Sequence, residues 1–202
     1  MKYQLFWILI YSVLVSCQDI EPRRPVSASS SSFINESIQR NKKRSAEEEA
    51  AIQEIITKDK DHTYLTSEHG FWYYYNSRDT LSTIKPKFGD EVVFDYSISD
   101  IEGNTIYPKK TLSNIVYRID KEDLFYGLRE GLKLMRTGET MTFLFPSYHA
   151  FGYYGDNDKI GTNIPIRSTV TLHSIQSAST LNDEVASRQI DSLQTDTVKK
   201  QN

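Results

Sequence analysis

Alternating apolar and polar residues predict β-strands through the middle of the chain. In the clearest run, EVVFDYSIS at residues 91–99, four apolar residues share one face: Val92, Phe94, Tyr96 and Ile98. Successive side chains of a strand point to opposite sides, so this run predicts a half-buried strand. The other predicted strands cover residues 70–75, 105–107, 114–119, 140–145 and 168–175. Short turns such as EGN favour an antiparallel sheet.

One short helix interrupts the strands. Residues 122–138 repeat apolar side chains at helical spacing, at Leu124, Leu128, Leu132 and Met135. Gly127 and Gly131 lie in the same segment, and each glycine weakens a helix by about 1 kcal/mol relative to alanine. Their presence predicts that the helix backbone lies close against the sheet. Gly138 supplies the C-terminal stop.

A second helix is predicted before the strands, at residues 46–59. The SAEE sequence is a capping box, with Ser45 at the N-cap and Glu48 three residues later. Apolar residues follow at helical spacing, at Ala51, Ile52, Ile55 and Ile56. Because this apolar stripe is narrow, we expect the helix to pack on the edge of the domain.

This order of elements predicts an α+β domain, in which an antiparallel sheet curls around one short helix. Such a sheet leaves a pocket between the start of the helix and the ends of the strands. The stretch FPSYHAFG at residues 145–152 would line that pocket. Pro146 ends the preceding strand because proline cannot donate to a sheet ladder. The glycine-containing loop at 152–161 is interpreted as a flap over the pocket mouth.

The N-terminus has the pattern of an export signal. Lys2 precedes an apolar stretch from Leu5 to Val15, which is too short to span a bilayer and is typical of a secretory signal. The stretch ends in LVSC, and Cys17 is the only cysteine of the chain. This sequence predicts a bacterial lipoprotein signal peptide at 1–16, with lipid attached to Cys17. The alternative is an ordinary signal peptide and an unmodified, buried Cys17.

The remaining segments complete the predicted domain organisation. Residues 17–44 hold two prolines and a serine run with few apolar residues, so we expect a flexible, lipid-anchored tether. The N-terminal helix unit is placed at 45–61 and the sheet domain at 62–176. Residues 177–202 are polar and weakly patterned, which predicts a disordered tail.

Composition and charge exclude several function classes. The formal net charge of −3 argues against nucleic acid as a partner, because a duplex binder needs a concentrated basic face. The four histidines are scattered and show no metal-ligand spacing. The chain has neither a Gly-x-Ser-x-Gly nucleophile elbow nor a phosphate-binding glycine loop. We therefore expect no metal and no cofactor.

Three separated motifs carry a family resemblance. They are GDEVVFDYSISDIEGNTIY, LFYGLREGLKLMRTGET and FPSYHAFG followed by IPIRSTVTLHSI. In order and approximate spacing they resemble the FKBP-type peptidyl-prolyl cis-trans isomerases over residues 70–176. With LVSC, the charged tether and GFWYYY, the chain is most similar to the gliding-motility-associated FKBP-type lipoproteins. This similarity implies a lipid-anchored protein of the bacterial envelope, in the outer membrane facing the periplasm.

The resemblance also implies a proline-binding pocket. The matching positions with a catalytic role are Tyr96, Phe125, Leu128 and Phe151. The matching substrate-binding positions are Ile106, Tyr107, Ile115, Leu124, Ile164 and Leu172.

The pocket departs from the family pattern at several of these positions. The family usually has an indole where Leu128 stands, and phenylalanine where Ile106 and Ile115 stand. It usually has an aspartate at the position of Tyr107. At the position of Phe151 it has a tyrosine whose hydroxyl hydrogen-bonds the bound carbonyl. The pocket stays apolar, but the number of its polar groups is reduced.

The function implied is isomerisation of X–Pro bonds in exported, proline-containing client polypeptides, assisting their folding or assembly. The apolar lining favours an isomerase, and the reduced polar groups predict weak activity. The alternative is a non-catalytic binding or scaffold lipoprotein of an envelope complex. In that case the pocket, or exposed tyrosines at Tyr148, Tyr153 and Tyr154, would hold a client or an envelope assembly partner.

Overall fold

The computed structural model describes residues 27–80 and 82–180. Its elements are α2 (Ser27–Lys58), β1 (Leu65–Thr66), β2 (Trp72–Ser77), β3 (Glu91–Asp100), β4 (Thr105–Tyr107), β5 (Ile115–Arg118), α3 (Tyr126–Leu134), β6 (Thr140–Phe145), the 3-10 helix η1 (Ser147–His149) and β7 (Ile166–Gln176). The chain divides into two compact units, at residues 1–41 and 42–202. The predictions for Cys17 and for the signal peptide lie outside the described residues, as does most of the predicted C-terminal tail.

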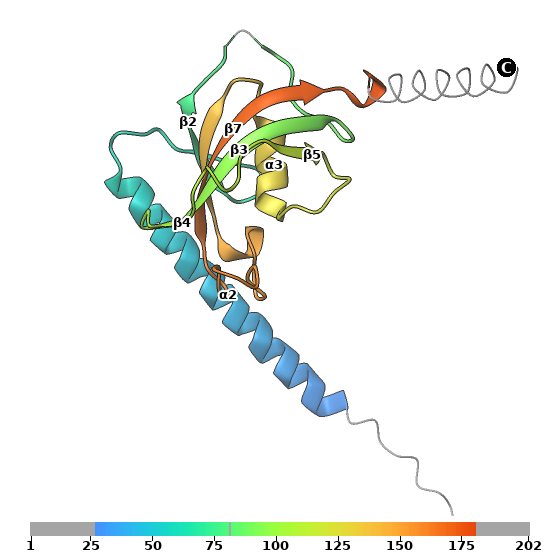
Figure 1. The fold of residues 1–202 in the computed structure, drawn as a ribbon. Helices are drawn as coiled ribbons and strands as arrows, with labels where there is room; N and C mark the ends of the chain where they lie inside the picture. Colours follow the sequence, from blue (N-terminus) through green and yellow to red (C-terminus); the bar gives the residue numbers. More distant parts are fainter. Residues whose placement is uncertain (1–26, 81, 181–202) are drawn as a thin grey trace, which may run out of the picture. The chain divides into compact units, whose positions relative to one another are not determined.

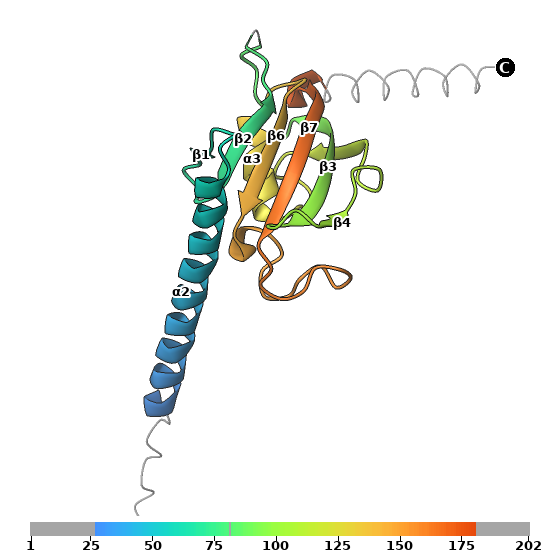
Figure 2. The same cartoon turned by 90° about the vertical axis from the view of Figure 1, so that its left-hand side faces the viewer.

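The strands form one antiparallel sheet in the order β1-β2-β6-β7-β3-β4, with β5 also paired to β3. Figure 2 shows β2, β6, β7 and β3 side by side. Every strand predicted from the alternation is present, with its ends shifted by no more than two residues. Only the short strand β1, which pairs with β2, was not expected. The predicted α+β class with an antiparallel sheet is therefore confirmed.

The helix α3 lies against one face of the sheet (Figure 1). A Cβ atom added to Gly127 would lie 2.5 Å from the ring of Phe145. One added to Gly131 would lie 3.0 Å from the ring of Phe143. The prediction that glycines allow a close approach of helix and sheet is confirmed. The helix is shorter than predicted, since it begins at Tyr126 and ends at Leu134.

The helix α2 corrects the prediction for the N-terminal region. It begins at Ser27, so the expected flexible tether is helical from that residue, and the expected helix start at 46 is wrong. Ser45 lies inside the helix instead of capping it. The last proline before the helix is Pro25, and no proline or glycine interrupts the chain from Ser27 to Lys58. The serine run and the charges lower helix propensity only slightly, so they do not prevent a continuous helix here.

The strand β6 is buried on both faces of the sheet. Met141, Phe143 and Phe145 join the main core beneath α3. Leu144 points to the opposite face, where it packs with Ile52 of α2 and with Ile101. Ile52 is fully buried, so the prediction that this helix packs on the domain through its apolar stripe is confirmed. The two faces of β6 thus connect α3 with the C-terminal part of α2.

Candidate functional site

Two aromatic rings meet at the start of α3. Phe125 immediately precedes the helix in an extended conformation, and its ring centroid lies 5.0 Å from that of Phe151 and 5.6 Å from that of Phe145. Phe145 is fully buried, whereas Phe125 and Phe151 are half-buried. Phe151 comes to this place because Pro146 ends β6 and η1 then turns the chain. The margin of the main core therefore presents two partly exposed rings.

The structure brings nine of the ten pocket residues expected from the sequence into the main core cluster. Seven lie at its partly exposed margin: Tyr96, Ile106, Tyr107, Ile115, Leu124, Phe125 and Phe151. Leu128 and Leu172 have no exposed surface, so a ligand would contact them only after neighbouring side chains moved. Ile164 is 37% exposed and lies outside the cluster. The roles of these residues in binding stay predictions.

Strand pairing explains how residues far apart in sequence reach the same margin. Phe94 of β3 pairs with Ile115 of β5 on one side and with Leu172 of β7 on the other. The next residue on the same face of β3, Tyr96, has its ring 5.5 Å from that of Phe94. Three strands therefore contribute neighbouring apolar side chains to the face that α3 covers.

Tyr107 connects β4 to the loop at 152–161. Its hydroxyl donates to Asp156 Oδ2 at 2.5 Å, and Asp158 Oδ2 lies 3.0 Å away. The hydrogen bond to Asp156 raises the pKa of Tyr107, and burial raises it further. The other carboxylate oxygen of Asp156 accepts the backbone N–H groups of Asp158 and Ile160 at 2.9 and 2.8 Å. The loop interpreted as a flap is thus tied to the sheet by an internal turn and one hydroxyl.

Gly155 is required within that turn. Its φ is +67°, and an added Cβ atom would collide with the carbonyl oxygen of Ile160. A side chain at this position would therefore force the turn apart. The sequence indicated a glycine loop, but it did not reveal that Asp156 closes the loop on Tyr107.

Tyr96 has a hydroxyl that stays available. Among residues 27–80 and 82–180, no hydrogen-bond partner of this hydroxyl is present. Burial raises the pKa of Tyr96, so its phenol remains protonated near neutral pH. A neutral phenol can donate one hydrogen bond to a carbonyl oxygen. The margin therefore combines apolar rings with one potential donor.

Glu48 has a role that the sequence did not indicate. The capping-box pattern predicted a contact within its own helix, which is wrong because α2 begins much earlier. Its carboxylate instead accepts the backbone N–H and the hydroxyl of Ser147, each at 2.8 Å. No local pattern could have paired residues separated by 99 positions.

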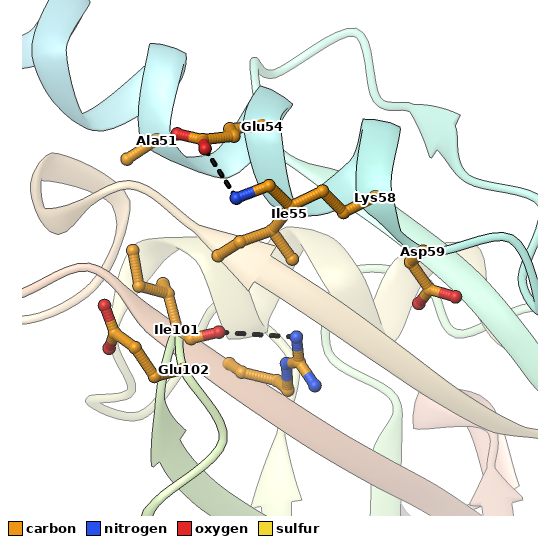
Figure 3. Close-up of a pocket in the computed structure, with 8 residues that line it drawn as sticks. Ala51, Glu54, Ile55, Lys58, Asp59, Ile101 and Glu102 are labelled. Atoms are coloured by element: carbon orange, nitrogen blue, oxygen red, sulfur yellow. Dashed lines mark hydrogen bonds and ion pairs between the residues drawn. The ribbon is translucent and has the colours of Figure 1, made fainter.

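A groove of about 520 Å³ lies elsewhere, between α2 and the turn after β3. It is lined by Ala51, Glu54, Ile55, Lys58, Asp59, Ile101, Glu102 and Arg167 (Figure 3). Lys58 pairs with Glu54 at 2.6 Å, and Arg167 donates to the carbonyl of Ile101 at 3.3 Å. None of the ten pocket residues lines this groove, and its mixed charges favour no single ligand class.

Two further observations concern metal ligands and membrane-spanning helices in the described part of the chain. Within residues 27–80 and 82–180, no group of three or more His, Cys, Asp or Glu side chains could hold a metal ion. In the same residues, no helix has the length and apolar character needed to cross a bilayer. The half-buried rings of Phe125 and Phe151 and the side chain of Tyr96 all lie at the margin of the main core.

Comparison with known proteins gives the following matches. Residues 82–173 match the sequence profile of the family described as FKBP-type peptidyl-prolyl cis-trans isomerase. The crystal structure of FkpA from Escherichia coli is similar with a TM-score of 0.54 and 23% identity, covering 88% of this chain and 83% of that chain. A 1.6 Å crystal structure of a peptidyl-prolyl cis-trans isomerase from Pseudomonas syringae pv. tomato is similar with a TM-score of 0.52 and 18% identity, covering 65% and 96%. No curated protein matches the sequence. At these identities the two structures support the fold alone.

Proposed function

We propose that the margin around Phe125 and Phe151 isomerises X–Pro bonds, because residues 82–173 match the profile of the FKBP-type peptidyl-prolyl cis-trans isomerase family. The observation that carries the proposal is the pair of half-buried rings, 5.0 Å apart, at the start of α3. Such a pair offers apolar surface to a proline ring at the edge of a rigid core. The client would be a flexible, proline-containing segment of another polypeptide.

The chemistry needed is modest. Rotation about an X–Pro bond has a barrier of about 20 kcal/mol because amide resonance keeps the bond planar. Water stabilises the planar amide by solvating its carbonyl oxygen. An apolar surface that grips the proline ring excludes this water and favours the twisted state, in which resonance is lost. Phe125 and Phe151 would contact the proline ring, with Leu128 supporting them from beneath.

The phenol of Tyr96 would supply the polar contact that Phe151 lacks. Phe151 stands where the family usually has a tyrosine, so it cannot hydrogen-bond the bound carbonyl. Tyr96 packs against the same core cluster as Phe151, and burial raises the pKa of its phenol, which therefore stays protonated. We expect weak isomerase activity, because one hydrogen bond of this kind contributes only about 1 kcal/mol. Tyr96→Phe should lower the activity further, and Phe151→Tyr should raise it.

The cellular setting is the second part of the proposal. The LVSC sequence supports lipidation at Cys17, which would anchor the protein in the bacterial envelope, in the outer membrane facing the periplasm. There it would act on exported clients, including components of a gliding-motility machinery. Labelled fatty acid should be incorporated into the wild type and not into Cys17→Ala. Equal labelling of both proteins would contradict the anchor.

The isomerase proposal is tested by a protease-coupled assay on a short X–Pro peptide. Phe125→Ala should abolish the catalysed rate. Phe88→Ala is the matched control, because the ring of Phe88 is 64% exposed and lies beside Lys121 instead of the aromatic margin. Both variants must first show wild-type melting profiles. No activity in the wild type would refute the proposal, as would full activity in a folded Phe125→Ala protein.

A non-catalytic binding module is the second candidate, favoured by the exposed tyrosines of the loop. Tyr153 and Tyr154 are 70% and 83% exposed, and their rings contact each other edge to face at 5.5 Å. Large exposed aromatic side chains are enriched at binding surfaces. A scaffold would tolerate Phe125→Ala in cells but lose its function when both tyrosines are replaced by serine.

A further inference from the structure

The segment that carries Phe151 is organised around Ser147. The carbonyl oxygen of Ser147 accepts the N–H groups of Ala150 and Gly152, at 3.0 and 2.9 Å. Phe151 lies between these two residues, so the position of its backbone follows that of Ser147. Ser147 itself is only 3% exposed. Whatever holds Ser147 therefore also holds Phe151.

Ser147 is held by Glu48 of α2. One carboxylate oxygen accepts the backbone N–H of Ser147 and the other accepts its hydroxyl, both at 2.8 Å. Glu48 is only 9% exposed, and bonds of this charge-assisted kind are about twice as strong as neutral ones. The neighbouring Glu49 accepts the hydroxyl of Tyr148 at 2.8 Å. Two consecutive glutamates of α2 thus fix the first two residues of η1.

We propose that Glu48 is a positioning residue for the isomerase site. By accepting both the backbone N–H and the side-chain hydroxyl of Ser147, it sets where Phe151 lies relative to Phe125. The inference rests on the proposed function, because it concerns the same pair of rings. It adds that the helix preceding the isomerase domain takes part in the activity without touching the substrate.

A purely structural role for Glu48 predicts something different. The same part of α2 is also docked by Ile52, which is fully buried against Leu144 and Ile101. If Glu48 merely docked the helix, removing Ile52 would disturb the site as much as removing Glu48. Ile52→Ala is therefore the matched control, since it loosens the helix and leaves both hydrogen bonds to Ser147 in place.

A conservative variant supplies the second control. In Glu48→Gln, the amide oxygen can accept the N–H of Ser147 while the amide NH₂ donates to its hydroxyl oxygen. Both hydrogen bonds then survive in the same geometry, although the charge is lost. Glu48→Ala keeps neither bond and leaves a buried N–H without a partner. A positioning role therefore predicts that glutamine rescues what alanine removes.

The experiment measures kcat and KM of the full chain with an X–Pro peptide. We expect Glu48→Ala to lower kcat/KM about tenfold, because small displacements of a binding group have large effects on rate. Glu48→Gln and Ile52→Ala should stay within about twofold of the wild type by the same reasoning. Wild-type kcat/KM in Glu48→Ala would overturn the inference. So would an equal loss in Glu48→Gln or in Ile52→Ala.

Hydrogen exchange separates this inference from the proposed function. Glu48→Ala should speed the exchange of the Ser147 and Gly152 amides, and Ile52→Ala should not do so selectively. Unchanged exchange at these amides in Glu48→Ala would overturn the positioning role even if the enzyme is active. A wild type without isomerase activity would refute the proposed function and the catalytic part of the inference together.

Discussion

The two faces of the sheet are built on different principles. The face beneath α3 is apolar, with Phe94, Phe143 and Leu172 fully buried against the helix. The opposite face holds a smaller apolar cluster around Leu144, beside polar side chains such as Thr142 and Asp95. Hydroxyl pairs such as Thr142–Thr169, 2.9 Å apart, cross from β6 to β7 there. The comparison indicates that apolar burial holds the fold together while polar contacts fix the position of particular segments.

The largest expected effect is on the free energy of unfolding. It distinguishes two neighbouring residues of β6, Phe143 and Leu144, which point to opposite faces of the sheet. Phe143→Ala should lower the free energy of unfolding by about 4 kcal/mol, because it leaves a cavity in the main core. Leu144→Ala should cost about 2–3 kcal/mol, because the smaller cluster can collapse around the gap. Urea denaturation at neutral pH measures both. An equal or larger loss in Leu144→Ala would contradict the difference between the faces.

The close approach of α3 to the sheet gives the next prediction. Gly127→Ala should destabilise the domain by about 1–3 kcal/mol, since the added methyl group meets both Phe145 and the carbonyl of His149. Gly161→Ala is the control, because its Cβ would have only an ordinary contact, at 3.8 Å from Ile164. The control should change stability by less than about 0.5 kcal/mol. Similar values for the two variants would show that the helix has room to move.

A buried carboxylate on the polar face predicts a pH dependence. Burial raises the pKa of Asp95, but hydrogen bonds to its charged form outweigh burial and bring the pKa to about 2. The donors are Asn114 N–H, His173 Nε2 and Lys109 Nζ, at 2.7, 2.8 and 3.2 Å.

Asp95 therefore stabilises the fold above the pKa of about 3.8 that it has when unfolded, and this stabilisation is lost as the pH falls towards 2. The wild type should lose stability steeply between those values. Asp95→Asn should be less stable at neutral pH and show a shallower loss. Parallel pH profiles in denaturant titrations would contradict this assignment.

The smallest expected effect concerns the loop tied to Tyr107. Tyr107→Phe removes the hydroxyl that binds Asp156, so the N–H groups of Asp158 and Ile160 should exchange faster. The pKa of Asp156, which its hydrogen bonds hold below the ordinary value against the opposing effect of burial, should rise. Tyr154→Phe is the control on the same loop, because Tyr154 is 83% exposed. Unchanged exchange in Tyr107→Phe would show that the loop closes without this contact.

The sequence predicted the sheet well because alternation is a local signal. The polarity of each residue in β3 predicts the face of the sheet on which its side chain lies. Pro146 predicts the end of β6 regardless of its surroundings, because proline cannot donate to a sheet ladder. The glycines of α3 correctly predicted that the helix lies close to the sheet. Glycine destabilises a helix relative to alanine, so two glycines in a short helix indicate that larger side chains would not fit there. The aromatic margin at Phe125 and Phe151 was anticipated from the family resemblance.

The contacts between distant segments could not be predicted in this way. The pairing of Glu48 with Ser147 and of Tyr107 with Asp156 depends on where the folded chain brings polar groups together. A carboxylate three residues after a serine has the same local pattern whether it caps a helix or crosses to another element. The length of α2 was also not predicted. Serine and charged residues lower helix propensity only slightly, so they do not show where a helix without proline or glycine begins.

The most direct test of the proposed isomerase site is an NMR titration of the full chain with an X–Pro peptide. If these residues form the isomerase site, signals of Tyr96, Phe125 and Phe151 should shift together along one binding curve. Signals of Ala51, Ile55 and Ile101 in the groove beside α2 should stay unchanged. Shifts confined to the groove, or no shifts at the aromatic margin at saturating peptide, would contradict the assignment of the isomerase site.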